Sequence, residues 1–160
     1  MAVHGLLHTF LIGVTSGLRS MTAPALVSWA AYLGWINLSN TPLAFLGYAA
    51  TPYIVSLLAI GELIADKLPS TPSRKAPPGF IARIVLGTLS GYALSLGIGQ
   101  SAVIGAVLGC VGGIAGTLGG YEARTRLVRR LKARDVVIAL FEDVVAIAVG
   151  LFVVYHNERI

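Results

Sequence analysis

The sequence predicts an all-α, polytopic transmembrane protein on the basis of its composition, its apolar runs and the breaks between those runs. Of its 160 residues, 56% are hydrophobic and only 12% are charged, whereas soluble globular chains average about 25% charged residues. The mean hydropathy is +0.80. At roughly 20 residues a crossing, the apolar runs provide about six short helical segments and leave little chain for a soluble part. We therefore expect a single membrane domain over residues 1–160.

The first apolar run covers residues 3–35 and is interrupted by the sequence Arg19-Ser-Met-Thr-Ala-Pro24. Hydroxyl side chains at Ser20 and Thr22, followed by Pro24, are typical of a helix start. We predict two helices, 3–18 and 22–35, each near or below the roughly 17-residue minimum for a full crossing. They form a broken or re-entrant pair, and the sequence is compatible with two crossings by this pair or with one.

A third helix is predicted from Pro52 to Leu68, because prolines at positions 69, 72, 77 and 78 favour a turn without regular structure. Further helices are predicted over 79–96, 100–120 and 136–154, with Gly97-Ile-Gly99 as the break between the first two. Residues 121–134 carry six Lys and Arg residues and are predicted as a loop that sets the topology. The alternative is an amphipathic helix that places Arg124 to Arg134 on anionic lipid headgroups.

A short motif, G-x-x-S-G, occurs at residues 13–17 and again at residues 87–91. With three segments in each half of the chain, 3–68 and 79–156 would be two inverted repeats, an architecture that many secondary transporters use. Nearly all Lys and Arg residues fall in the junctions that six segments would put on one side. By the positive-inside tendency that side is cytoplasmic, and we expect both termini outside.

Glycines recur at helical spacing in three of the predicted helices, which favours close helix packing. The expected packing positions are Gly13, Gly17, Gly87, Gly91, Gly105, Gly109, Gly112 and Gly116. Their partner is either another helix of the same chain or a second copy of the protein. We expect a homo-oligomer, because six short helices have little room to enclose a site.

Charged residues inside the apolar segments are the main candidates for function, because such residues are costly in a membrane and usually face the interior of the helix bundle. Glu62 and Asp66 are four residues apart and share a helix face. At a similar predicted depth lie Arg19, Arg83, Glu142 and Asp143. Together they predict a cytoplasm-facing pocket that binds a cation or exchanges a proton. The alternative is snorkelling and structural ion pairing, which we favour for Asp66 with Lys67.

Other kinds of site find little support in the sequence. No nucleophile motif, phosphate loop or catalytic triad is present, so we expect no enzyme, although a lipid-modifying enzyme that uses Glu142 and Asp143 stays open. His4, His8 and His156 lack a further ligand pattern, so no metal site and no cofactor is expected. The basic residues lie at helix junctions, which does not favour a nucleic-acid partner.

Three blocks carry a resemblance to a known family: Gly17-Leu-Arg-Ser-Met-Thr-Ala-Pro24, Glu62-Leu-Ile-Ala-Asp-Lys-Leu-Pro69 and Phe141-Glu-Asp143. They resemble a family of small bacterial integral-membrane proteins catalogued as a domain of unknown function, DUF4126. The resemblance implies a multi-pass protein of the bacterial inner membrane and supplies no reaction. From the charged pocket we predict a transporter or channel for a small solute or ion. The alternative is a non-transporting membrane scaffold or a lipid-binding protein.

Overall fold

The computed structural model describes residues 2–67, 76–132 and 134–157, and within them all regular secondary structure is helical. Its elements are α1 (Ala2–Leu18), α2 (Thr22–Tyr32), a short 3₁₀ helix η1 (Ala44–Gly47), α3 (Thr51–Ala65), α4 (Pro77–Gly97), α5 (Ala102–Leu131) and α6 (Asp135–Asn157). The six α-helices and the lack of any strand in the described ranges confirm the predicted all-α class.

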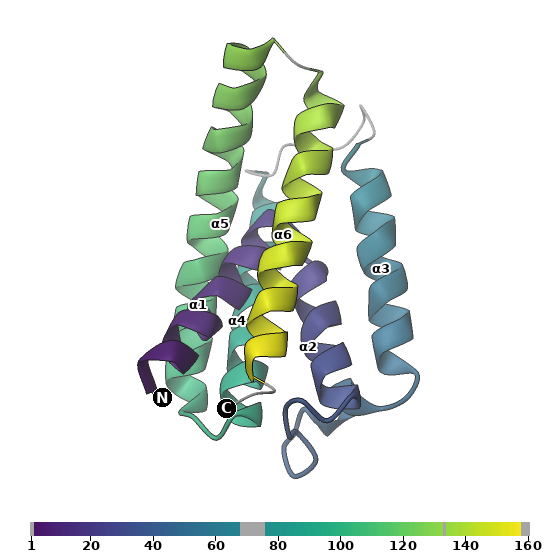
Figure 1. Ribbon diagram of the computed structural model, residues 1–160, viewed down its shortest axis with the longest axis vertical. Helices are drawn as coiled ribbons and strands as arrows, with labels where there is room; N and C mark the ends of the chain where they lie inside the picture. Colours follow the sequence, from purple (N-terminus) through teal and green to yellow (C-terminus); the bar gives the residue numbers. More distant parts are fainter. Residues whose placement is uncertain (1, 68–75, 133, 158–160) are drawn as a thin grey trace.

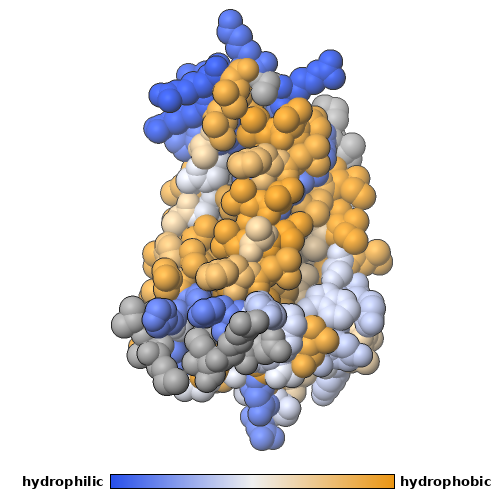
Figure 2. Space-filling model, in the orientation of Figure 1, coloured by the Kyte–Doolittle hydropathy of each residue, from blue (hydrophilic) through white to orange (hydrophobic). Residues whose placement is uncertain are grey.

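Three helices are long and apolar enough to cross a membrane: Pro77–Gly97, Ala102–Leu131 and Asp135–His156. The apolar helix Thr51–Ala65 is shorter. Figure 2 shows a hydrophobic band along the middle of one face, with hydrophilic side chains at the end where α5 and α6 meet. This surface is typical of a membrane protein and confirms that prediction.

The first two helices form a hairpin that turns back part-way along the molecule (Figure 1). α1 has 17 residues and α2 has 11, so both are short. The N-terminus, the start of α3 and the C-terminus all lie at one end of the molecule (Figure 1). The hairpin is therefore the predicted broken pair, and it begins and ends at the same end of the molecule. α2 ends at Tyr32 rather than at the predicted Trp35, because Gly34 adopts a φ of 77° that an α-helix cannot accommodate.

Two predicted boundaries near the charged end were wrong. Residues 121–131 continue α5 instead of forming a loop, because this stretch has no glycine or proline and arginine is a good helix former. The helix ends where Lys132 takes the left-handed conformation, with a φ of 48°. Pro77 and Pro78, predicted in an irregular turn, occupy the first turn of α4, where proline fits. The predicted end of the third helix at Leu68 lies outside the described residues.

The glycines pack within the chain, with α5 lying between α1 and α4. A Cβ atom added at Gly13 would overlap the carbonyl oxygen of Gly109, and one added at Gly91 would overlap that of Gly105. The other six expected packing positions are as crowded, each against a neighbouring helix: Gly17, Gly87, Gly105, Gly109, Gly112 and Gly116. Both G-x-x-S-G segments thus rest on the glycines of α5. An oligomer would have to use another surface.

Candidate functional site

The break between α1 and α2 is held by a carboxylate from α3. Glu62 Oε1 accepts hydrogen bonds from the backbone nitrogen of Ser20 at 2.8 Å and from the Ser20 hydroxyl at 2.6 Å, while Oε2 accepts one from the backbone nitrogen of Met21 at 2.8 Å. These N–H groups precede the first turn of α2, where donors have no partner within the helix and the helix dipole favours negative charge. Glu62 therefore replaces the cap that the sequence of the turn does not supply.

Arg19, in the same turn, is completely buried and reaches two other helices. Its Nε donates to Asp143 on α6, and its Nη1 donates to Asp66 at the end of α3. Its Nη2 lies 3.9 Å from Glu142 Oε2 and 3.5 Å from the carbonyl oxygen of Ala139. One side chain thus ties the break to α3 and to α6.

Two more cations approach the same carboxylates from α4 and α3. Arg83, on α4, has Nη2 at 3.8 Å from Glu62 Oε1 and at 3.6 Å from Asp66 Oδ2. Lys67, just after α3, donates from Nζ to Asp143 Oδ2 at 2.6 Å and to the carbonyl oxygen of Leu63 at 2.8 Å. Asp143 is therefore shared between Arg19 and Lys67.

Arg124 extends the arrangement to α5. Its Nη1 lies 3.9 Å from Glu142 Oε2, and its Nε donates to Asp135 Oδ1, at the start of α6, at 2.8 Å. We call the less exposed members of this connected set the charge cluster; it contains Arg19, Lys67, Arg83, Arg124, Glu62, Asp66, Glu142 and Asp143. Asp135, which is 61% exposed, pairs with Arg124 at its edge.

All six predicted pocket residues therefore meet in one place, together with two that the sequence analysis left out of the site. Lys67 was assigned to a surface ion pair, and Arg124 was assigned to a loop. The unbroken helix propensity of residues 121–131 would have placed Arg124 on α5, one turn beyond Gly120, and is the signal that could have found it. Nothing in the sequence near Lys67 indicates that its partner is Asp143.

The cluster is closed rather than open to water. The side chains of its carboxylates are 8–13% exposed, whereas that of Lys67 is 24% exposed and is the most accessible of the eight. Among the carboxylates of the cluster, Asp143 is the least exposed. The described residues include no group of three or more His, Cys, Asp or Glu side chains placed to hold a metal ion. The rings of His8 and His156 lie 5.1 Å apart, on helices α1 and α6.

Comparison with known proteins assigns the chain to a family. A family model described as a domain of unknown function (DUF4126) matches residues 6–157. The chain belongs to the DUF4126 family. The matched range contains every residue of the charge cluster, and it confirms the resemblance noted in the sequence. No curated protein and no solved structure matches this DUF4126 chain, so no activity comes from the comparisons.

Proposed function

We propose that this DUF4126 protein moves a proton or a small cation across the membrane and that the charge cluster is its exchange site. The observation that carries the proposal is the gathering of eight ionisable side chains, none of them more than 24% exposed, at the break between two short helices. Taking charges out of water costs several kcal/mol per ion, and apolar side chains of similar volume often stabilise a protein as well or better. Stabilisation alone is thus a weak reason for this arrangement, and a charge inside a membrane protein is a functional candidate.

The packing of the helices supports a movement of α6 relative to the other helices. The contacts between glycines join α1, α4 and α5 at backbone distance. By contrast, α6 is flanked by two cavities, one of about 390 Å³ toward α2 and α3 and one of about 150 Å³ toward α5. Glu142 and Asp143 are carried by α6. We propose that α6 shifts against the rigid unit of α1, α4 and α5, as one bundle rocks against another in transporters built from inverted repeats.

Asp143 is the group that would couple ion binding to this shift. A proton on its carboxylate removes the charge that attracts Arg19 on one side and Lys67 on the other, and a cation would compete with Lys67 for Oδ2. Either event loosens α6 from the turn and from α3. In this mechanism Lys67 is the internal cation that occupies the site when no transported cation is bound. We propose no catalytic role for Glu142 or Asp143.

The test is flux through purified protein in liposomes, measured for protons and for alkali cations under an imposed gradient. We expect a flux that Asp143→Asn abolishes, measured on the fraction of the variant that elutes as a single folded peak in size-exclusion chromatography. The matched control is Glu122→Gln, which alters an exposed ion pair with Arg126 on α5. No flux under any gradient, or equal flux in wild type and Asp143→Asn, would overturn the proposal. Absent flux would favour the non-transporting scaffold or lipid-binding alternative, which the complete pairing of the cluster also fits.

A further inference from the structure

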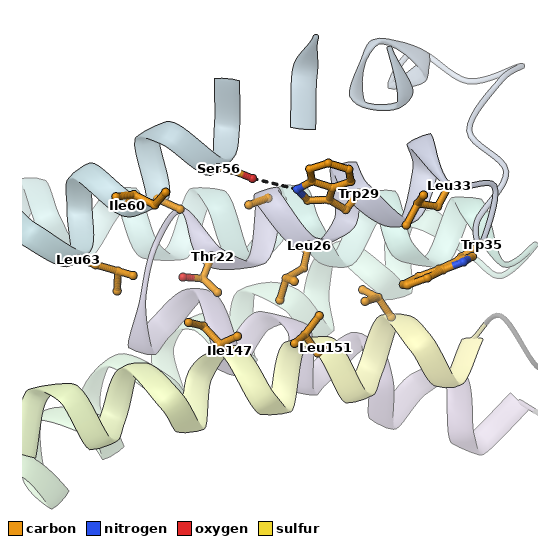
Figure 3. Close-up of a pocket in the computed structure, with 13 residues that line it drawn as sticks. Thr22, Leu26, Trp29, Leu33, Trp35, Ser56, Ile60, Leu63, Ile147 and Leu151 are labelled. Carbon is orange, nitrogen blue, oxygen red and sulfur yellow. Dashed lines mark hydrogen bonds between the residues drawn. The ribbon is translucent and has the colours of Figure 1, made fainter. Parts of the chain in front are cut away.

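An apolar groove opens between α3 and α6, with α2 as its floor (Figure 3). It has a volume of about 390 Å³, within the range of about 300–1,000 Å³ that is usual for sites of small molecules. Leu26 lies at its centre, between Ile60 on α3 and Leu151 on α6. Ser56 lines it too, but the Ser56 hydroxyl is already the acceptor of the Trp29 indole N–H at 2.9 Å. The groove therefore suits a hydrocarbon chain.

The two ends of the groove differ in chemistry. One end is formed by Thr22, Leu63 and Ile147 and the other by Leu33 and Trp35, while Trp29 lies near the middle (Figure 3). Leu63 precedes Lys67 by four residues and Ile147 follows Asp143 by four, so one helical turn separates this end from the charge cluster. From Ser56 to Leu63 the groove follows α3 for about 10 Å, at roughly 1.5 Å per residue. The groove is therefore apolar along its length, and Lys67 lies next to one of its ends.

The charged residues near the groove indicate which class of membrane lipid it would bind. Every Lys, Arg, Asp and Glu of the described residues belongs to the charge cluster or to the adjoining part of α5 and the α5–α6 connection, nine basic residues against six acidic ones. Among these residues, Lys67 uses two of its three ammonium donors, on Leu63 and Asp143. The third donor and the positive excess suit a phosphate group.

We propose that this groove binds one acyl chain of an anionic phospholipid, with the lipid phosphate at Lys67. A helix from a second copy is the competing occupant, and the measurements below distinguish it from a lipid. The lipid stabilises α3 against α6 by filling the space between them. This inference does not depend on transport, since it concerns the groove and not the carboxylates.

The chain has two tryptophans, and both line the groove, so their fluorescence reports on its occupant. The full chain would be placed in phosphatidylcholine vesicles containing increasing amounts of phosphatidylglycerol with brominated acyl chains, which quench tryptophan on contact. We expect saturable quenching, half-complete at a mole fraction about fivefold lower than with brominated phosphatidylcholine, as one basic side chain near the surface would give.

Single substitutions test the binding of the acyl chain and the binding of the phosphate independently. Ala59→Phe and Leu151→Phe place a ring in the groove and should raise the half-quenching mole fraction severalfold; Leu151 is partly exposed, so its variant tolerates the larger side chain. Leu57→Phe, at a residue that is 71% exposed on α3 and absent from the lining, is the control and should change nothing. Lys67→Gln should keep the quenching but lose the preference for phosphatidylglycerol.

Two outcomes would overturn the inference. Quenching that rises in proportion to mole fraction, is equal for both headgroups and is the same in Ala59→Phe and Leu151→Phe would mean ordinary contact with bulk lipid. Tryptophans shielded from both brominated lipids in a protein that sediments as a dimer would mean that a second copy covers the groove. No gradient is applied in these measurements, so a protein that transports nothing can still pass them, and one that transports can still fail.

Discussion

Ser20 gives both its backbone N–H and its hydroxyl to a single oxygen of Glu62, at 2.8 and 2.6 Å, and thereby joins the break in the first hairpin to α3. The break is a place where two helices end away from the surface, so its backbone groups need partners from elsewhere in the chain. Glu62 supplies those partners, and its own charge is offset by Arg83 at 3.8 Å. The helix break and the charge cluster therefore depend on each other.

This dependence predicts that Glu62→Gln lowers stability. Glutamine offers one acceptor oxygen, so its amide nitrogen would face either Ser20 or Met21, a donor against a donor. Hydrogen bonds to charged groups contribute about 1.5–3 kcal/mol each, and we expect a loss of this size in thermal unfolding in detergent. The control Glu122→Gln removes one partner of an exposed pair and should cost less than about 1 kcal/mol. Equal melting temperatures for wild type and Glu62→Gln would contradict this role.

A second prediction concerns Arg19, which is completely buried among Asp66, Glu142 and Asp143. Arg19→Met leaves these carboxylates with fewer counter-charges, and stranding a buried charge costs about 3–5 kcal/mol. We expect the variant to accumulate poorly as folded protein, as judged by yield and by a single peak in size-exclusion chromatography.

A double variant tests whether Arg19→Met destabilises the protein through lost charge balance or through lost packing. The double variant Arg19→Met/Asp143→Asn removes one positive and one negative charge, so the net charge of the cluster is that of the wild type and the yield should recover. Arg126→Met, at a side chain that is 67% exposed, is the control and should express normally. If the double variant accumulates no better than Arg19→Met alone, the shape of the arginine matters and its charge does not.

Local signals in the sequence account for most of the helix ends. The break before α5 was predictable from Gly97 and Gly99, because these residues act on their own backbone. Thr22 and Pro24 indicated where α2 begins, but neither caps the helix, and Glu62 does so instead. The continuation of α5 over residues 121–131 was not predicted, since the cluster of basic residues indicated a junction between segments, although no glycine or proline interrupts the helix there. The enrichment of Lys and Arg at the ends of membrane segments indicates the orientation of those segments and does not determine whether the basic residues form a loop or a helix.

The sequence predicted most of the residues that form the candidate site but not which of them pair with one another. Depth in the membrane was enough to select Glu62, Arg83 and Asp143, because burial of a charge is unusual wherever it occurs. The pairing of each residue depends on how α3 and α6 approach the hairpin, which no local pattern determines. For this reason Glu62 was expected to face a cation or an arginine, whereas its nearest partners are the hydroxyl of Ser20 and the backbone N–H groups of Ser20 and Met21.

A third prediction tests the glycine packing. A Cβ atom at Gly109 would overlap the carbonyl oxygen of Gly87, so Gly109→Ala should push α4 away from α5 and lower stability by about 1–3 kcal/mol, as overpacking does. Gly119, on the same helix, has nothing within 4 Å of such an atom. Gly119→Ala should therefore leave stability unchanged or raise it by up to about 1 kcal/mol, through helix propensity. Similar melting temperatures for the two variants would mean that α4 and α5 tolerate a wider separation.

The last prediction concerns the orientation of the protein in the membrane. The charged residues gather where α5 and α6 meet, at the end away from both termini (Figure 1, Figure 2). Because basic residues favour the cytoplasmic side, we expect this end inside and both termini outside. Reporter fusions after Asn37 and at the C-terminus should give periplasmic activity, and a fusion after Arg130 cytoplasmic activity. A cytoplasmic C-terminus would reverse the orientation and would place Lys67 and the headgroup end of the groove in the outer leaflet.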